Sequence, residues 1–268
     1  MLVKEIFSKL WDDYSQRTPS AQKIKDLFEK TGNTVSNDHI AIRTFNDKRV
    51  NIDVLSKLFV ANGYEVKGEY QFPAKKLYAK HFEHKTDKSA PLVFISELKL
   101  EELSVELQSI INNTLNEVDF DNVNVEELIF QGRIWNKPSH ELYSTLLNES
   151  EYAAWTYING FCANHFTVNV NELSNFENLE EVNAFLKENG YTLNSSGGEI
   201  KGTKELFLEQ SSVLADKITM DFEEGNFEVT SCYYEFAFRY DVLPGIQFRG
   251  FIANSADKIF ESTDMILN

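Results

Sequence analysis

Three side chains of this sequence have the types and positions of a metal-binding set. His39 and His165 each lie near the start of a predicted strand, and Glu235 lies within a later strand that is rich in aromatic residues. A carboxylate in such a strand is costly to bury unless it is paired, hydrogen-bonded or bound to a metal. Two imidazoles and one carboxylate suit non-haem Fe(II) and leave positions open for substrate and O2, although the same donors also accept Zn(II), Ni(II) or Mn(II). We therefore expect a metal site.

Each of these residues also has an ordinary structural interpretation. A single histidine in a strand is more often a hydrogen-bonded core or edge residue than a metal ligand. Glu235 and Arg239 are four positions apart and share a strand face, so they could form a purely structural pair. The joint occurrence of two equivalent histidines and a late carboxylate favours metal binding. In that case we expect Arg239 to orient Glu235 and so to support catalysis.

The remaining histidines and cysteines are weaker candidates. His81 and His84 are three positions apart, which fits one face of a helix or a loop and could bind zinc, but the neighbouring Lys and Asp residues indicate a solvated segment. His140 is expected at a helix start or in a loop, and Cys162 as a small buried apolar residue. The sequence contains neither the glycine-rich phosphate-binding motifs nor the nucleophile-elbow motif.

The candidate ligands recur within a duplicated pattern. Residues 37–45 and 164–170 are short, rich in β-branched and aromatic residues and introduced by asparagine, which predicts two strands. Each is followed by a predicted helix, over 54–59 and 179–186, and then by the tripeptide Asn-Gly-Tyr. On each strand the histidine lies on the more polar face, while the other face is apolar. The repeat predicts two copies of one module with a site between them.

The expected organisation is a single domain of four consecutive segments. In order they are N-terminal helices, a first module, a helical insertion and a second module, over residues 1–35, 36–100, 101–160 and 161–268. Residues 98–118 are expected to form one long amphipathic helix. In the second module, the strands after the helix are expected to form an antiparallel set that covers residues 205–208, 218–222 and 233–240.

Composition excludes several classes of protein. The sequence has 26 Lys and Arg against 42 Asp and Glu, and the resulting net charge of −16 argues against a nucleic-acid partner. No apolar stretch approaches the roughly 20 residues of a membrane-spanning helix, so we expect a soluble globular protein without a membrane partner. The two cysteines cannot build a disulfide framework, and no export signal is recognisable, so a cytoplasmic location is expected.

Four motifs in chain order resemble the family of 2-oxoadipate dioxygenase/decarboxylase, which belongs to the vicinal oxygen chelate superfamily. The motifs are Asn37-Asp38-His39-Ile40-Ala41-Ile42-Arg43-Thr44-Phe45, Asn164-His165-Phe166-Thr167, Glu235-Phe236-Ala237-Phe238-Arg239 and Ala256-Asp257-Lys258-Ile259-Phe260-Glu261-Ser262-Thr263. The resemblance extends from Trp11 to Thr263, and the chain is similar to a compact form of the family.

The resemblance implies both a fold and a set of site residues. The implied fold is α+β, with two βαβββ-type modules that form a half-open barrel around one metal and with added helices at the N-terminus and between the modules. The three candidate ligands match the family's iron ligands in order and motif. Arg43 matches the arginine that holds a substrate carboxylate, and Gln210 and Ser255 fall where further substrate contacts are implied.

The implied activity is oxidative decarboxylation. A 2-oxo acid similar to 2-oxoadipate would react with O2 and yield a 2-hydroxy acid and CO2, with Fe(II) as cofactor. Two other functions remain open at this point. One is redox-silent chemistry of a hydrolase, lyase or isomerase that uses Zn(II), Ni(II) or Mn(II) on the same scaffold, and the other is non-catalytic binding of a small molecule.

Overall fold

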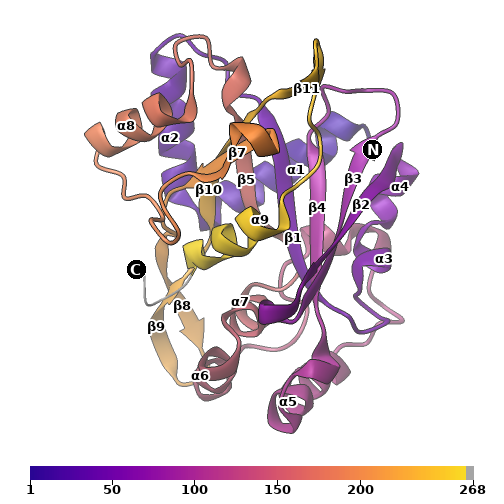
Figure 1. Cartoon of the computed structure of the whole chain (residues 1–268). Helices are drawn as coiled ribbons and strands as arrows, with labels where there is room; N and C mark the ends of the chain where they lie inside the picture. The colour runs from indigo at the N-terminus through magenta and orange to yellow at the C-terminus, as the bar shows by residue number, and fades with distance from the viewer. Residues whose placement is uncertain (264–268) are drawn as a thin grey trace. The chain divides into compact units, whose positions relative to one another are not determined.

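The computed structural model describes residues 1–263, apart from the side chain of Asp257 (Figure 1). Residues 264–268, the end of the expected second module, lie outside the described residues. The described chain divides into two compact units. Unit 1 comprises Met1–Tyr14, Ala41–Asn164 and Lys217–Val229, and unit 2 comprises Ser15–Ile40, His165–Asp216 and the described residues from Thr230 onward.

Unit 1 contains the helices and strands of the first module and of the expected helical insertion. Its elements are α1 (Val3–Arg17), β1 (Asn37–Phe45), α3 (Ile52–Leu55), α4 (Lys57–Ala61), β2 (Tyr64–Phe72), β3 (Leu77–His84), β4 (Leu92–Leu98), α5 (Val105–Asn116), α6 (His140–Glu149), α7 (Glu151–Asn159), β8 (Lys217–Phe222) and β9 (Gly225–Thr230). Three of these elements are divided between the units: α1 belongs to unit 1 up to Tyr14, β1 belongs to it from Ala41 onward, and β9 belongs to it up to Val229. The strand order is β2-β3-β4-β1, and the pairs β2–β3 and β3–β4 are antiparallel. Asn51 starts α3, because its side chain accepts a hydrogen bond from the backbone N–H of Val54.

Unit 2 contains the second module and the first residues of β1. Its elements are α2 (Pro19–Lys30), β5 (Ala163–Asn169, from His165), α8 (Leu179–Glu188), β6 (Lys201–Thr203), β7 (Leu208–Ser212), β10 (Tyr233–Arg239), β11 (Asp241–Leu243), β12 (Ile246–Gln247) and α9 (Ala253–Ile259). The strand order is β1-β5-β10-β7-β6. β10 is parallel to β5 and antiparallel to β7. Each unit therefore carries one βαβββ-type module, as the repeat predicted.

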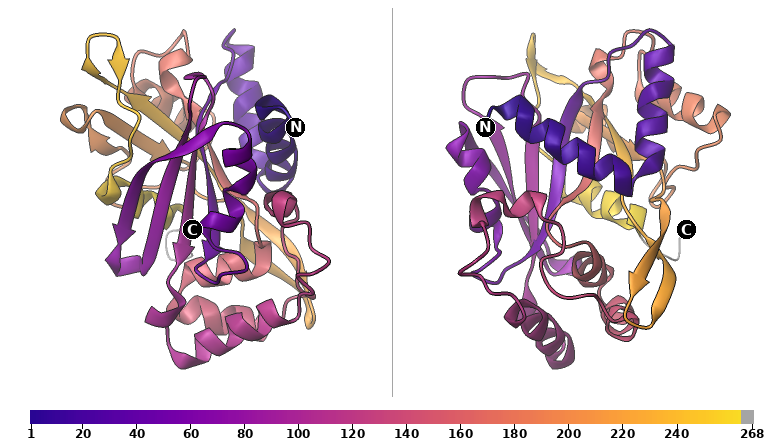
Figure 2. Two further views of the ribbon diagram at one scale, coloured as in Figure 1. Left: turned by 90° about the vertical axis from the view of Figure 1, so that its right-hand side faces the viewer. Right: turned by 180° about the vertical axis from the view of Figure 1, so that it is seen from behind.

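The strands of unit 2 are covered on both faces. On the apolar face, Phe28 of α2 packs against Phe236 of β10 and Phe185 of α8, with ring centroids 6.1 and 5.5 Å apart. Figure 2 (right) shows α2 on the near side of these strands and α9 on the far side. Since β5 and β10 are buried along almost their whole length, the polar face that carries the candidate ligands is also shielded from solvent.

Two expectations about secondary structure were wrong. His81 and His84 lie in the strand β3, and His81 is buried with its ring contacting the Tyr70 hydroxyl at 2.8 Å, so the segment is not a solvated helix or loop. Residues 98–118 do not form one helix, because β4 runs to Leu98 and α5 begins only at Val105. The neighbouring Lys and Asp residues suggested that His81 is exposed to solvent. Because side chains alternate between the two faces of a strand, the His81 ring instead points into the protein interior.

The expected antiparallel set of the second module also differs in part. β8 and β9 pair only with each other and lie in unit 1. The aromatic side chains of this pair of strands pack against α6. The His140 ring stacks on the Phe227 ring with centroids 3.7 Å apart, and its centroid is 5.2 Å from that of Phe222. The predicted strand at residues 205–208 is instead a short 3-10 turn followed by β7 from Leu208.

Two further features concern membrane-spanning helices and the cysteines. Within residues 1–263, no helix combines the length and the apolar character needed to cross a bilayer. Cys162 and Cys232 are both buried and form no disulfide within residues 1–263, and the burial of Cys162 agrees with its expected role as a small apolar core residue.

Candidate metal centre

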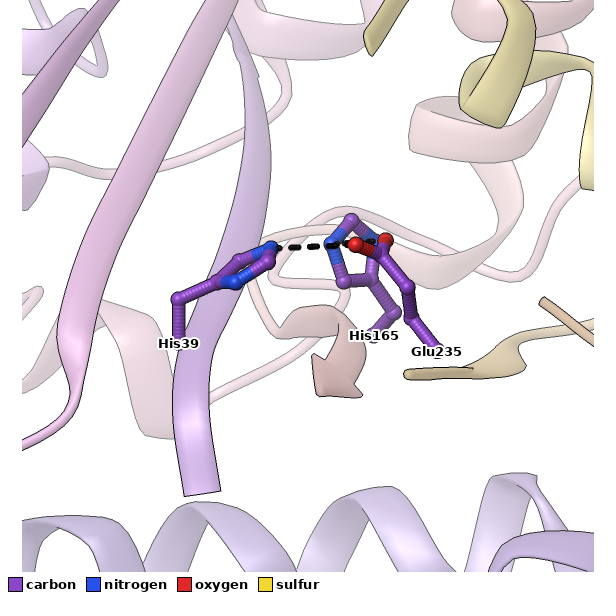
Figure 3. A group of neighbouring side chains, drawn as sticks. All are labelled: His39, His165 and Glu235. Carbon is purple, nitrogen blue, oxygen red and sulfur yellow. Dashed lines mark ion pairs between the residues drawn. The ribbon is translucent and has the colours of Figure 1, made fainter. Parts of the chain in front are cut away.

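The three predicted ligands meet in unit 2 (Figure 3). One ligand atom from each of His39, His165 and Glu235 lies within 4.8 Å of the others. Nε2 of His39 is 3.5 Å from Oε1 of Glu235, and Nε2 of His165 is 3.2 Å from Oε2. All three side chains are buried. Among the described residues, this is the one group of at least three His, Cys, Asp or Glu side chains whose ligand atoms converge in this way.

The register of the strands explains how Glu235 reaches the histidines. β10 runs parallel to β5, with Tyr233 opposite His165 and Glu235 opposite Thr167. Side chains two residues apart share a strand face, so His165, Thr167 and Glu235 point to the same side. His39 lies on β1, the neighbour of β5 in unit 2, and its Nε2 is 3.1 Å from the Thr167 hydroxyl.

The electrostatics of Glu235 fit a bound cation. Burial raises the pKa of Glu235 to about 7, although His39 and a hydrogen bond from Gln210 act in the opposite direction. Oε2 of Glu235 has no hydrogen-bond partner among the described residues. A divalent ion between this oxygen and the two imidazole nitrogens would neutralise the carboxylate and satisfy the orphaned oxygen. The residues therefore fit a metal ion, while the donor types by themselves do not select which one.

Asp38 fixes the orientation of His39. Its Oδ2 accepts a hydrogen bond from Nδ1 of His39 at 2.7 Å, which leaves Nε2 of the ring to face Glu235. Burial opposes ionisation of Asp38, but the charge of Arg239 and the hydrogen bonds from His39 and Arg239 outweigh it, so the pKa of Asp38 lies well below its usual range. A carboxylate behind a metal-binding imidazole holds the ring in place and increases its basicity.

Arg239 acts on the site through Asp38, which corrects the expectation that it orients Glu235. Its Nε and Nη2 donate to the two carboxylate oxygens of Asp38 at 2.6 and 2.9 Å. Its Nη1 donates to the backbone carbonyls of Phe248 and Gly250, so the guanidinium is fixed from both sides. Its influence on the Glu235 carboxyl is limited to its charge. The sequence did not indicate Asp38 as a site residue, because strand neighbours normally point to opposite faces.

Gln210 contacts the candidate metal ligand Glu235, and Ser255 lies on a neighbouring helix. Gln210 is buried, and its Nε2 donates to Oε1 of Glu235 at 2.6 Å. Ser255 lies on α9 and is also buried. Its Oγ is 3.3 Å from the point that a Cβ on Gly202 would occupy, so α9 packs closely against β6 at this point. Phe251, just before α9, places its ring against His39 with centroids 4.8 Å apart.

Arg43 belongs to unit 1, where it is a buried carboxylate-binding residue. Its Nη1 lies 3.0 and 3.3 Å from the two carboxylate oxygens of Glu151, and its side chain is 1% exposed. The guanidinium stacks over the rings of Tyr152 and Trp155 at 4.9 and 5.0 Å.

Comparison with known proteins identifies relatives over almost the whole chain. The family model of 2-oxoadipate dioxygenase/decarboxylase matches residues 6–243. A rice protein named 2-oxoadipate dioxygenase/decarboxylase, chloroplastic/amyloplastic, is 35% identical over 287 residues, which cover 97% of this chain and 78% of the rice protein.

Three solved structures are similar to this one. A protein from Shewanella frigidimarina with a provisional hydrolase name is 49% identical, with a TM-score of 0.87 over 94% of this chain and 98% of that chain. The hydroxyglutarate synthase of rice in complex with 2-oxoadipate is 33% identical, with a TM-score of 0.92 over 98% and 92%. A glyoxalase superfamily protein from Ralstonia eutropha is 19% identical, with a TM-score of 0.78 over 91% and 83%, and shares the fold. The expected α+β fold is confirmed.

The buried carboxyl predicts that metal affinity depends on pH. A proton and a divalent ion compete for Glu235, whose pKa is raised to about 7. The carboxyl alone should therefore increase the apparent affinity for Co(II) about tenfold between about pH 6 and about pH 8, with little further gain above that range. Titration with Co(II) against a chromophoric chelator measures the affinity. Glu235→Gln should lose this contribution, and Glu228→Gln, at an exposed position of β9, should keep it. An equal pH dependence in all three proteins would contradict the assignment.

Asp38→Asn should weaken metal binding although all three ligands remain. The substitution removes the charge that pairs with both His39 and Arg239, so the imidazole is held less firmly and the buried guanidinium loses its partner. The expected loss of Co(II) affinity is about 10- to 100-fold. Asp26→Asn, on the exposed side of α2, is the matched control and should bind as the unaltered protein does. Unchanged affinity in Asp38→Asn would show that the hydrogen bond to His39 is dispensable.

Proposed function

The chain belongs to the 2-oxoadipate dioxygenase/decarboxylase family, and from that premise we propose that it is an Fe(II)-dependent enzyme that converts 2-oxoadipate and O2 to 2-hydroxyglutarate and CO2. The observation that carries the proposal is the convergence of His39, His165 and Glu235 on one buried position. Three protein ligands on one side of an ion leave other positions for the substrate and O2. The relative whose structure contains 2-oxoadipate supports the choice of substrate.

His39, His165 and Glu235 would hold the iron, and the residues that contact them fix their orientation. Bound Fe(II) would orient the carboxylate and keto oxygens of the acid and supply electrons to O2. Asp38 keeps the His39 ring in the tautomer whose Nε2 can bind the metal. Gln210 donates to Oε1 of Glu235 and thereby leaves Oε2 available. The burial of all these groups excludes bulk water and strengthens each interaction.

We assign Arg43 to a carboxylate of the substrate. Its buried, planar guanidinium is held between aromatic rings and already binds one carboxylate, that of Glu151. A substrate carboxylate would take the place of Glu151, which is the more exposed member of the pair with 27% of its side chain accessible. Arginine suits this role better than lysine, because its two parallel N–H groups match the two oxygens of a carboxylate.

Two further contacts with the substrate complete the proposal. Oε1 of Gln210 is buried without a hydrogen-bond partner among the described residues, so the amide has an acceptor available for a hydroxyl or a bound water. Ser255 offers a hydroxyl from α9. For the location of the protein we keep the cytoplasm, which is consistent with the reduced thiols of Cys162 and Cys232. The two plant relatives are named as chloroplastic proteins.

Loss of a metal ligand should abolish O2 consumption. His39→Ala and Glu235→Gln should each reduce O2 uptake with 2-oxoadipate to background, because neither leaves a complete set of ligands. Glu228→Gln, which alters an exposed carboxylate, should keep full uptake. An oxygen electrode measures the rate, and circular dichroism verifies that each variant is folded.

The same assay separates the proposed reaction from redox-silent chemistry on this scaffold. Full substrate conversion under anaerobic conditions by the unaltered protein would overturn the dioxygenase assignment in favour of hydrolase, lyase or isomerase chemistry. A ligand variant that consumes O2 at the normal rate would overturn the assignment of the metal site.

Arg43→Lys should affect the substrate far more than the metal. Lysine keeps the positive charge but loses the fork that binds both oxygens, so KM for 2-oxoadipate should rise about tenfold or more while affinity for Co(II) stays within about twofold. Arg49→Lys is the control, since this partly exposed arginine pairs with Asp47. Parallel losses of substrate and metal binding in Arg43→Lys would indicate that Arg43 has a structural role only.

A further inference from the structure

Three cationic side chains, those of Arg43, Lys201 and Arg239, are buried among the described residues. Arg43 is paired with the carboxylate of Glu151, and Arg239 is paired with that of Asp38. Lys201 forms no ion pair within the described part of the chain, although it is only 4% exposed. Burying an ammonium ion without a counter-charge is costly, so an unpaired buried lysine requires an explanation.

The strand register places Lys201 on the face of the sheet that carries the metal ligands. Lys201 of β6 lies opposite Gln210 of β7, and Gln210 lies opposite Ala237 of β10. Directly opposed residues share a face, and so do residues two apart on one strand, such as Ala237 and Glu235. Lys201, Gln210 and Glu235 therefore belong to one face, and Gln210 already donates to Glu235.

The hydrogen bonds of Lys201 leave part of its capacity unused. Its Nζ donates to the backbone carbonyl of Asn194 and, at 3.4 Å, to that of Glu199. An ammonium group has three N–H donors, and carbonyl oxygens do not neutralise its charge. Burial lowers the pKa of Lys201 to about 8, while the charges of Glu235, Glu261 and Glu199 act in the opposite direction. The side chain is therefore a cation at neutral pH and lies within electrostatic range of the metal ligand Glu235.

We propose that Lys201 binds the substrate carboxylate that is remote from the 2-oxo group and so makes the site selective for dicarboxylic 2-oxo acids. This inference rests on the proposed function, since it concerns the same site. The carboxylate beside the keto group would be held by the metal and Arg43, and the remote one needs its own cation. Lys201 is the buried cation of unit 2 that has no carboxylate partner among the described residues.

The buried charges of unit 2, those of Asp38, Lys201, Glu235 and Arg239, support a substrate with two negative charges. Asp38 and Arg239 cancel each other, and Glu235 and Lys201 contribute one negative and one positive charge. A divalent ion on the three ligands leaves the site with two uncompensated positive charges. A dicarboxylate neutralises both, whereas a monocarboxylate leaves one buried charge unbalanced, which is unfavourable in a site of low polarity.

Lys201 also has a structural contact that the test must separate from ligand binding. Asn194, whose carbonyl accepts from Lys201, donates through its side chain to the carbonyl of Lys258 and to the hydroxyl of Ser262. Lys201 thus helps to hold the segment that supports α9. A purely structural lysine would affect every ligand alike, whereas a carboxylate-binding lysine affects only the ligand that has the second carboxylate.

The experiment compares two 2-oxo acids of equal chain length. 2-Oxoadipate and 2-oxohexanoate differ in the terminal carboxylate, and their dissociation constants for the Fe(II)-loaded protein are measured by calorimetry without O2. Lys201→Met should weaken 2-oxoadipate binding about 10- to 100-fold, the usual effect of losing a charged hydrogen bond, and should change 2-oxohexanoate binding less than about twofold. Lys204→Met removes a charge from an exposed position three residues away and should change neither constant.

Each result has a definite meaning. An equal loss for both acids in Lys201→Met, or an unaltered preference for the dicarboxylate, overturns the assignment of Lys201. An unaltered protein that binds 2-oxoadipate no more tightly than 2-oxohexanoate also overturns it. O2 uptake by the unaltered protein with 2-oxoadipate tests the proposed function separately, so either conclusion can fail alone. Thermal unfolding of Lys201→Met, compared with that of Lys204→Met, reports the contribution of the contact with Asn194.

Discussion

The candidate metal site of unit 2 is built around one buried carboxylate. Glu235 is fully inaccessible and faces two imidazole nitrogens at 3.5 and 3.2 Å, and an isolated ionised carboxylate in such surroundings costs several kcal/mol. In the absence of a cation the protein responds by holding a proton on Glu235 more tightly than water does. A divalent ion removes this cost, since it meets the carboxylate and both histidines at once. The fold therefore pre-forms a site whose electrostatics are completed only when metal binds.

The orientation of the ligands depends on contacts between residues that are distant in the sequence. Asp38 and Arg239 are 201 positions apart, yet their bidentate pair lies directly behind His39. A buried ion pair is weak evidence for stability, because desolvation offsets much of its attraction. Its clearer effect here is geometric, because it fixes the imidazole and, through the carbonyls of Phe248 and Gly250, the segment that places Phe251 against His39.

The buried cations have different partners and therefore different roles. Arg239 donates four hydrogen bonds, to Asp38 and to two carbonyls, and its charge is paired with Asp38, so it has little capacity to bind a ligand. Arg43 is paired with Glu151, which a substrate carboxylate would replace in the proposed complex, and Lys201 has only carbonyl acceptors among the described residues. In the proposed site, selectivity for a dicarboxylic acid follows from the number of uncompensated buried charges. A hydrophobic pocket alone discriminates weakly between ligands of similar size, whereas an unbalanced buried charge discriminates strongly.

Residue type and repetition were sufficient to identify the ligands, because alternation along a strand is a local property. The sequence alone placed His39 and His165 at equivalent positions of two modules and marked Glu235 as a carboxylate too costly to bury without a partner. It also indicated the helical insertion and the α+β class. Tertiary structure decided which strands are neighbours and in what register. Only that register brings Asp38 next to Arg239, Gln210 next to Glu235, and Lys201 onto the face that carries the candidate ligands. The strand pairing also separates β8 and β9 from the sheet of the second module. Hydrogen bonds between strands depend on pairings that no local pattern encodes, so these contacts could not be read from the chain.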